Sequence, residues 1–356
     1  MNYRTIFLLL LSTLALSPPL FSQNYENDRD LLGNDFEVGI EGEININSQT
    51  NGRGALDLNN SYVTLTAEWK NKIRGVITTR LEDIFEENSV SLNPEFSLKE
   101  FIKEAYIEIR EVDGRPIALV VGKQPMAFGQ NVQAMPIFGD NPLKDDLQEI
   151  DEVYGFTIDL YEGIFGVFDQ VEISVFESER KDLKIGKVDG LSVRLSKMLT
   201  EKWLLTASHS SQGNSHLDTG RESRTSIGLI GESSDGYLVG WIEGIYFSNN
   251  PRYQDSVYGF TAGGMIRVHE TTDVIVEYNH IQKEIHEIGL GVRTALTRNL
   301  TVGGEVRLTN DINIDDKSLT FGINLNYTFG PRGRPVNQDY LFESKINDSE
   351  DDILKY

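Results

Sequence analysis

The chain has 356 residues and a formal net charge of -22, and this acidic surplus excludes nucleic acid as an expected partner, because phosphate binding needs a basic face. It contains no cysteine, which excludes disulfides, thiolate metal sites and a cysteine-linked lipid anchor. The 32 Gly, 14 Tyr and 17 Phe suit strands with one apolar and one polar face, in a transmembrane barrel or in a soluble secreted β-protein.

The N-terminus predicts export. Arg4 precedes an apolar run from Ile6 to Leu16, and the small residue Ser22 follows two prolines, so residues 1–22 have the order of a signal peptide cleaved after Ser22. A single membrane anchor is the alternative, but the run is shorter than the about 20 apolar residues that a bilayer requires. We expect residues 23–33 to form an N-terminal periplasmic segment, followed by a barrel over residues 34–329.

The mature chain repeats a pattern of alternating apolar and polar residues. In residues 36–46, Phe and aliphatic side chains alternate with three glutamates, Gly39 and Asn45, so one strand face is apolar and the other needs water. The longest unbroken aliphatic stretch is only Ile117 to Val121, which predicts no transmembrane helix. Strands are predicted at 36–46, 63–69, 73–81, 105–111, 117–123, 154–160, 171–177, 191–196, 203–210, 223–231, 237–247, 258–268, 274–280, 288–295, 300–308 and 319–329.

Two segments depart from simple alternation. Ser97 to Ile109 also fits an amphipathic helix, although the neighbouring pattern favours a strand. Tyr237 to Phe247 is apolar on both faces, which suggests that loop or plug material packs against it from inside the barrel.

The connections alternate in length along the chain. Short ones are predicted at 70–72, 113–116, around Glu162 and Gly163, and at 200–202, 233–236, 269–272 and 297–299. Longer ones are predicted at 48–53, 83–101, 125–152, 180–189, 211–221, 249–255, 282–287 and 310–317. This alternation predicts an all-β, antiparallel transmembrane barrel of about 16 strands, with short periplasmic turns and long external loops.

The longest connection, 125–152, is the third long one, and by length and position it resembles the third external loop of general porins, which folds inward and narrows the pore. Its acidic side chains would then lie in the constriction, with Lys144 as the one basic residue among them. The alternative is an ordinary solvated external loop. The acidic residues are Asp140, Asp145, Asp146, Glu149, Asp151 and Glu152.

One local sequence resembles known families. The segment Val121-Gly-Lys-Gln-Pro-Met-Ala-Phe-Gly129, preceded by Glu104-Ala-Tyr-Ile107, is similar to outer-membrane porins of the siderophore-porin (LbtU-like) and phosphate-selective (O/P) families. The resemblance covers about a third of the mature chain and departs from the usual pattern at Met126-Ala127. It implies a porin, and it leaves the solute open because a phosphate-selective pore is expected to carry a surplus of Lys and Arg.

Strand parity predicts which charged side chains point inward. Arginines on one wall facing acidic loop residues would set up a transverse field that orients polar solutes; the alternative is that these charges merely solvate one another. The net acidic chain favours a weak preference for cations. The candidates for the pore wall and constriction are the six acidic loop residues together with Arg74, Arg80, Arg110, Lys123, Arg293 and Arg307.

Catalysis and metal binding are not predicted. His209 stands between two serines, but neighbours on a strand face opposite ways, so no Ser-His pair can form there directly. His280 and His286, near Glu284 and Glu287, could hold a metal, although histidines beside loops are usually ordinary surface residues. We therefore expect no enzyme activity, no cofactor and no metal.

The sequence predicts a porin that passes small hydrophilic solutes, with outer-membrane lipid and the barrel assembly machinery as partners and a homotrimer as one open assembly. The alternatives are a scaffold or adhesin-like barrel that displays loops, and a substrate-specific siderophore or phosphate porin. After Phe329, residues 330–356 form an acidic tail, which is either a disordered periplasmic extension or a plug that re-enters the lumen.

Overall fold

A computed structural model describes residues 36–50, 61–70, 72–81, 102–130, 153–164, 167–177, 188–213, 221–249, 256–297, 299–312 and 316–330. The predicted signal peptide, the periplasmic segment and nearly all of the acidic tail lie outside these residues. So do the six acidic residues of the third long connection.

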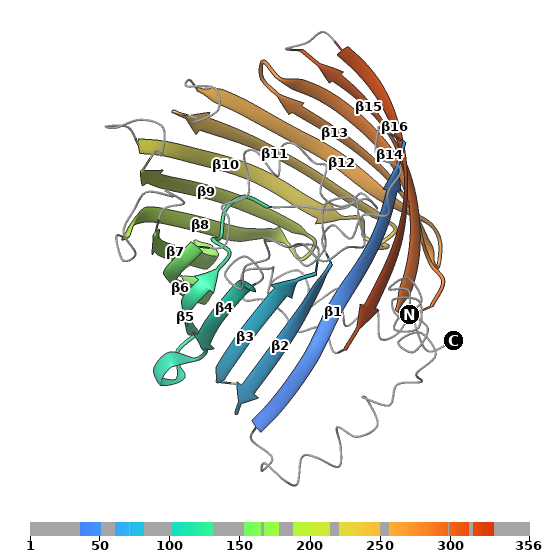
Figure 1. Ribbon diagram of the computed structural model, residues 1–356. Coiled ribbons are helices and arrows are strands. Elements are labelled where there is room, and N and C mark those ends of the chain that lie inside the picture. The colour runs from blue at the N-terminus through green and yellow to red at the C-terminus, as the bar shows by residue number, and fades with distance from the viewer. Residues whose placement is uncertain are drawn as a thin grey trace, which may run out of the picture.

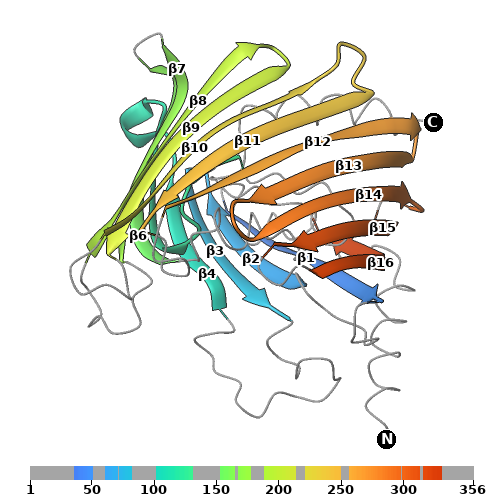
Figure 2. The ribbon, with the colours of Figure 1, turned by 90° about the horizontal axis from the view of Figure 1, so that it is seen from above.

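The described chain folds into one closed barrel of antiparallel strands (Figure 1). Each strand pairs with its neighbours in sequence, and β1 pairs with β16 to close the ring (Figure 2). All sixteen predicted strands are confirmed. They are β1 Phe36–Gln49, β2 Tyr62–Trp69, β3 Ile73–Arg80, β4 Ile102–Ile109, β5 Ile117–Gln124, β6 Val153–Ile164, β7 Phe168–Glu177, β8 Val188–Thr200, β9 Trp203–Gly213, β10 Arg221–Glu232, β11 Leu238–Ser248, β12 Val257–His269, β13 Thr272–Ile281, β14 Ile285–Ala295, β15 Leu300–Asp311 and β16 Asp316–Phe329.

Alternation along the strands separates two surfaces. The outward positions carry exposed aliphatic side chains such as Ile323 and Ile227, which are 66% and 60% exposed. The inward positions are mainly polar, small or charged, and Asn45, Glu108 and Thr157 are buried there. An apolar outside and a polar inside reverse the usual distribution in a soluble protein and match a barrel that meets lipid.

The first and last strands of the barrel pair at a glycine. Gly42 of β1 pairs with Phe329 of β16, and a Cβ on Gly42 would lie 2.5 Å from Cζ of the Phe329 ring. Only glycine leaves room for an aromatic ring across the strand at this point. Phe329 therefore packs over the seam between the first and last strands.

The two ends of the barrel differ in their connections. One end, which we call the long-loop end, carries the connections 50–61, 81–101 and 125–152; the other carries the short turns. Several of the predicted connection bounds are wrong. The connection between β13 and β14 is a turn of residues 282–284, and the turn expected at Glu162 and Gly163 lies beyond Ile164, because β6 continues through them.

The described part of the segment that also fits a helix, residues 102–109, forms a strand. Ile102–Ile109 pairs with β3 and β5 as β4, so the register of its neighbours decides over its helical spacing. The described helical residues are limited to a 3-10 turn at Val112–Gly114. In the part of the chain that the structure describes, no helix has the length and apolarity needed to cross a membrane.

Candidate functional site

The inner wall of the barrel is the candidate site, because it gathers the charged side chains of nearly every strand. Basic side chains are fewer than acidic ones in the described wall. By strand register the inward basic residues are Arg74, Arg80, Arg110, Arg194, Arg224, Arg267, Arg293 and Arg307. The inward acidic residues are Glu37, Glu41, Glu43, Glu68, Glu104, Glu108, Asp159, Glu172, Glu222, Glu232, Glu243, Asp273, Glu277, Glu287, Glu305 and Asp311.

One charged group lies on β2 to β4. The Arg110 guanidinium donates to Glu108 through Nε at 2.5 Å and Nη2 at 3.1 Å, and through Nη1 to Glu68 at 3.4 Å. Arg74 is the cross-strand neighbour of both glutamates. Two arginines thus face two carboxylates, so this part of the wall is locally balanced.

A second group lies on β6 to β8 and is richer in acid. Asp159 and Glu172 are direct cross-strand neighbours, and both are fully buried. The Gln170 amide donates to both oxygens of Asp159 at 3.1 and 3.0 Å, and the Arg194 guanidinium donates to Glu172. The positive charge of Arg194 offsets the electrostatic repulsion between these two adjacent buried carboxylates.

A third group lies on β13 to β15. Arg307 contacts Glu305 through Nε at 2.5 Å and Glu287 through Nη1 at 3.4 Å. The Asn279 amide donates to Glu277 at 2.9 Å and to Glu287 at 3.4 Å. Closer to the short-turn end, Asp273 accepts from Arg267 and Arg293, each at 3.1 Å. Three carboxylates around Arg307 leave this stretch of wall acidic.

The first residues of the third long connection run across the inside of the wall. The Ser192 hydroxyl of β8 donates to the Ala127 carbonyl at 2.9 Å, and the Gly129 amide donates to Ser208 of β9 at 2.9 Å. The Gln130 amide donates to the Glu243 carboxylate of β11 at 3.0 Å. We call residues 125–130 the inward segment, because hydrogen bonds fix it to the lumen side of three strands.

Apolar contacts hold the inward segment as well. Met126 and Phe128 pack into a buried cluster on the lumen side, which supplies the material expected against the doubly apolar strand β11. The other members are Val153, Phe176, Ile245, Phe247, Val257 and Ile281. Burial of two large side chains stabilises the contact between the inward segment and the wall by about 3 to 6 kcal/mol. The segment therefore has a fixed position on the wall.

Five of the six predicted basic residues lie on the lumen wall. Arg74, Arg80, Arg110, Arg293 and Arg307 all follow the inward register; only their role in selectivity stays a prediction.

Lys123 does not line the lumen. It shares the outward face of β5 with Val121, which is 51% exposed, and its ammonium donates to the Ile102 carbonyl at 2.5 Å. Lys123 can face outward because it lies at the end of a strand, where a long side chain on the apolar face can turn its charge back to the backbone.

The histidines form no catalytic arrangement within the described residues. His209 points outward and bonds Thr225 at 2.9 Å, whereas Ser208 follows the inward register. His280 and His286 stack on the outer face at 4.4 Å between ring centroids, and Glu287 belongs to the inner face. Among the residues described, no group of three metal-ligating side chains converges.

Sequence reasoning missed several wall residues. Asp159, Glu172, Glu277 and Glu287 occupy inward positions that strand parity alone could have identified. Glu243 carried a weaker signal, a single charge within an apolar strand. Its bond to Gln130 joins residues 113 positions apart, a contact that no local pattern contains.

The chain was compared with known proteins by sequence and by structure. A scan against protein-family models finds no match, and a search of curated proteins finds none either.

Solved structures do match. The outer membrane channel DcaP of Acinetobacter baumannii has a TM-score of 0.63 at 10% identity, over 83% of this chain and 98% of that one. The trimer form of the Vibrio cholerae outer membrane protein OmpT has a TM-score of 0.56 at 12% identity, over 83% and 100%. An anion-selective porin from Comamonas acidovorans has a TM-score of 0.53 at 12% identity, over 83% and 100%. The chain therefore has the fold of porin-like outer-membrane barrels.

Proposed function

We propose that this chain is an outer-membrane porin that lets small hydrophilic solutes diffuse through its lumen, with a weak preference for cations. The observation that carries the proposal is the closed ring of sixteen strands with an apolar outer face and a polar, charged inner face. In this proposal the signal peptide delivers the chain to the periplasm, the barrel assembly machinery inserts it, and the long-loop end faces outward from the cell.

The barrel's width favours a channel over a filled scaffold. A barrel of about eight strands can be filled by its own side chains, whereas the lumen of about sixteen cannot. Among the described residues, hydrogen bonds fix the inward segment to β8, β9 and β11. We infer that polar solutes pass between this segment and the opposite wall of β1 to β4.

The acidic wall favours cations. Carboxylates exceed guanidinium groups along the described lumen, and a surplus of one sign concentrates ions of the opposite sign. A phosphate-selective pore would be expected to have the opposite surplus, which makes this alternative less favoured. The acidic loop residues Asp140, Asp145, Asp146, Glu149, Asp151 and Glu152 would strengthen the same preference if they lie in the constriction.

The reversal potential tests this preference. With potassium chloride at unequal concentrations on the two sides of a planar bilayer, we expect the zero-current potential to have the sign of a membrane more permeable to potassium. The variant Glu287→Gln, which removes one carboxylate beside Arg307, should move that potential toward zero. A zero-current potential with the sign of chloride permeation in the wild type would contradict the cation preference.

The uneven height of the wall supports a homotrimer as the assembly. Strands β2 to β5 have 8 residues each, which at about 3.3 Å per residue and a tilt of about 45° span about 19 Å, less than the about 25 Å apolar band of outer-membrane barrels. β1 and β16 have 14 residues. We infer that the low wall of β2 to β5 contacts neighbouring copies of the chain and is shielded from lipid there.

A charge on the low wall tests this assembly. Ile77 is 46% exposed on the outer face of β3, so Ile77→Arg should convert a trimer in detergent into single chains, measured by light scattering on a sizing column. Ile323→Arg on β16, outside the low wall, should leave the trimer intact. Equal masses for wild type and Ile77→Arg would refute the low wall as the interface.

A further inference from the structure

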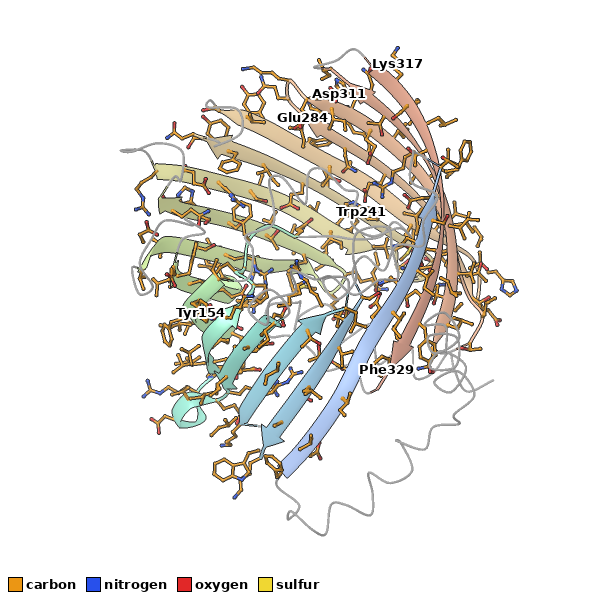
Figure 3. The ribbon with its side chains drawn as sticks, in the orientation of Figure 1. Tyr154, Trp241, Glu284, Asp311, Lys317 and Phe329 are labelled. Carbon is orange, nitrogen blue, oxygen red and sulfur yellow. The ribbon has the colours of Figure 1, made fainter. Side chains whose placement is uncertain are left out.

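A row of polar side chains crosses four strands on the outer face of the barrel at the long-loop end. His280 of β13 is paired with His286 of β14, His286 with Asn310 of β15, and Asn310 with Lys317 of β16. Neighbouring strands lie about 4.8 Å apart, so the four side chains form one short, continuous row. We call it the polar row. Figure 3 shows Lys317 at the same edge of the barrel as Glu284 and Asp311, opposite Phe329 on β16.

Next to the polar row, toward the middle of the barrel, the outer face is aliphatic. Two residues further along the strands lies a parallel row of Ile288, Leu308 and Leu319, paired in the same order. They are 50%, 49% and 49% exposed. The change from aliphatic to hydrogen-bonding side chains within one step marks the height at which the barrel leaves hydrocarbon and meets headgroups.

The row presents hydrogen-bond donors that no described residue uses. The Lys317 ammonium and the Asn310 amide have no hydrogen-bond or ion-pair partner among the described side chains. The ring of His286 is fixed, because its Nδ1 lies 3.0 Å from the Tyr278 hydroxyl. When this hydroxyl donates to Nδ1, the proton of the neutral ring is on Nε2 and is directed elsewhere.

Neighbouring contacts hold the row in place. The His280 Nδ1 donates to the Ile285 carbonyl at 3.2 Å, and its ring stacks on that of His286 at 4.4 Å with an interplanar angle of 16°. The two stacked rings therefore form a flat end to the row. The flexible stem of Lys317 can bring its charge toward Asn310 and His286 from the other end.

The charges around the row favour an anion. Lys283, in the turn between β13 and β14, is exposed at the same end. The nearby carboxylates do not point to the outer face: Glu287 and Asp311 follow the inward register, and Glu284 is buried in the turn. Among the described outward side chains at this edge of β13 to β16, the charge is therefore positive, in a chain that is strongly acidic as a whole.

We propose that the polar row binds the phosphate group of an outer-leaflet lipid, with Lys317 supplying the charge and Asn310 and His286 the hydrogen bonds. The acyl chains of this lipid would lie against Ile288, Leu308 and Leu319. A phosphate with several acceptor oxygens matches three donors of this kind, and a lipid source matches the aliphatic surface immediately below. The inference rests on the proposed outer-membrane location of the chain.

The full chain, refolded in a neutral detergent, provides the test. Binding of diphosphoryl lipid A is measured by native mass spectrometry for the wild type, for the double variant His286→Phe with Lys317→Gln, and for Lys317→Arg. The phenylalanine keeps the stack on His280 and removes the donor. We expect the double variant to bind about tenfold more weakly, because it loses one surface cation and one hydrogen bond, and Lys317→Arg to bind as the wild type does.

The matched control is Lys72→Gln, at the short-turn end, which should leave lipid binding unchanged. Heat-modifiable migration on gels shows that each variant is folded. Equal affinity for wild type and double variant would overturn the proposal, as would full competition by inorganic phosphate, which identifies a general anion site. A change in oligomeric mass with unchanged lipid affinity would also overturn it. Ion conductance of the same preparation reports separately on the proposed channel.

Discussion

Replacement of Gly129 by valine is expected to raise the time-averaged single-channel conductance, because it weakens the attachment of the inward segment to the wall. Gly129 has φ of +66°, and a Cβ there would lie 2.5 Å from Oε1 of Glu243. A β-branched residue in this conformation costs about 2 kcal/mol, which shifts the balance between a seated and a released segment roughly thirtyfold. Planar-bilayer recordings of single openings measure the effect.

Gly244→Val is the matched control for this experiment. Gly244 lies next to Glu243 on β11, and no heavy atom comes within 4 Å of the position that its Cβ would take. This variant should conduct as the wild type does. A lower conductance in Gly129→Val, or an equal rise in both variants, would show that the inward segment does not narrow the lumen.

Arg194→Met is expected to destabilise the barrel by about 3 kcal/mol, since it leaves a buried carboxylate without its cation. Glu172 and Asp159, 1% and 0% exposed, are adjacent on the wall, so their mutual repulsion increases when the Arg194 charge is lost, although Gln170 still donates to Asp159. Urea unfolding of the refolded barrel in detergent, followed by tryptophan fluorescence, measures the change in the free energy of unfolding.

Two further variants isolate the cause. Adding Glu172→Gln to Arg194→Met removes one of the two adjacent carboxylate charges and should restore most of the lost stability. Lys72→Met breaks an ion pair of 3.8 Å whose side chains are more than half exposed, so it should change stability by less than about 1 kcal/mol. If Arg194→Met is no more destabilising than Lys72→Met, the pairing on β6 to β8 is not structurally important.

The sequence predicted the barrel because its determinant is local. Each strand needs an apolar face for the outside and a polar face for the lumen, and this requirement appears as alternation within a single segment, as in Leu319 to Phe329. Turn lengths were less certain. Gln282 to Glu287 resembles a polar loop, yet its last three residues belong to β14, because pairing with β13 and β15 extends the ladder into polar sequence.

The candidate site was only partly predictable, because parity gives the direction of a side chain and not its partner. Arg110 and Arg307 were assigned to the wall from alternation, whereas their carboxylate partners depend on the register between strands. The seat of the inward segment depends on contacts between distant residues. The unusual apolarity of both faces of β11 was the signal that something would pack there, and Met126 and Phe128 supply it.

Lys123 shows that alternation has to be followed to the end of a strand. It lies two residues from Val121, so alternation along β5 places it on the outer face, where near the strand end its ammonium bonds a backbone carbonyl. The same principle applies to Lys317, whose outward position also lies at a strand end.

Ion conductance of the purified chain in a planar bilayer tests the central claim most directly. We predict discrete current steps at a fixed voltage, with open channels that carry potassium in preference to chloride and that pass a larger current in Gly129→Val. A folded, inserted barrel that gives no current steps would contradict the claim that solutes cross through this lumen.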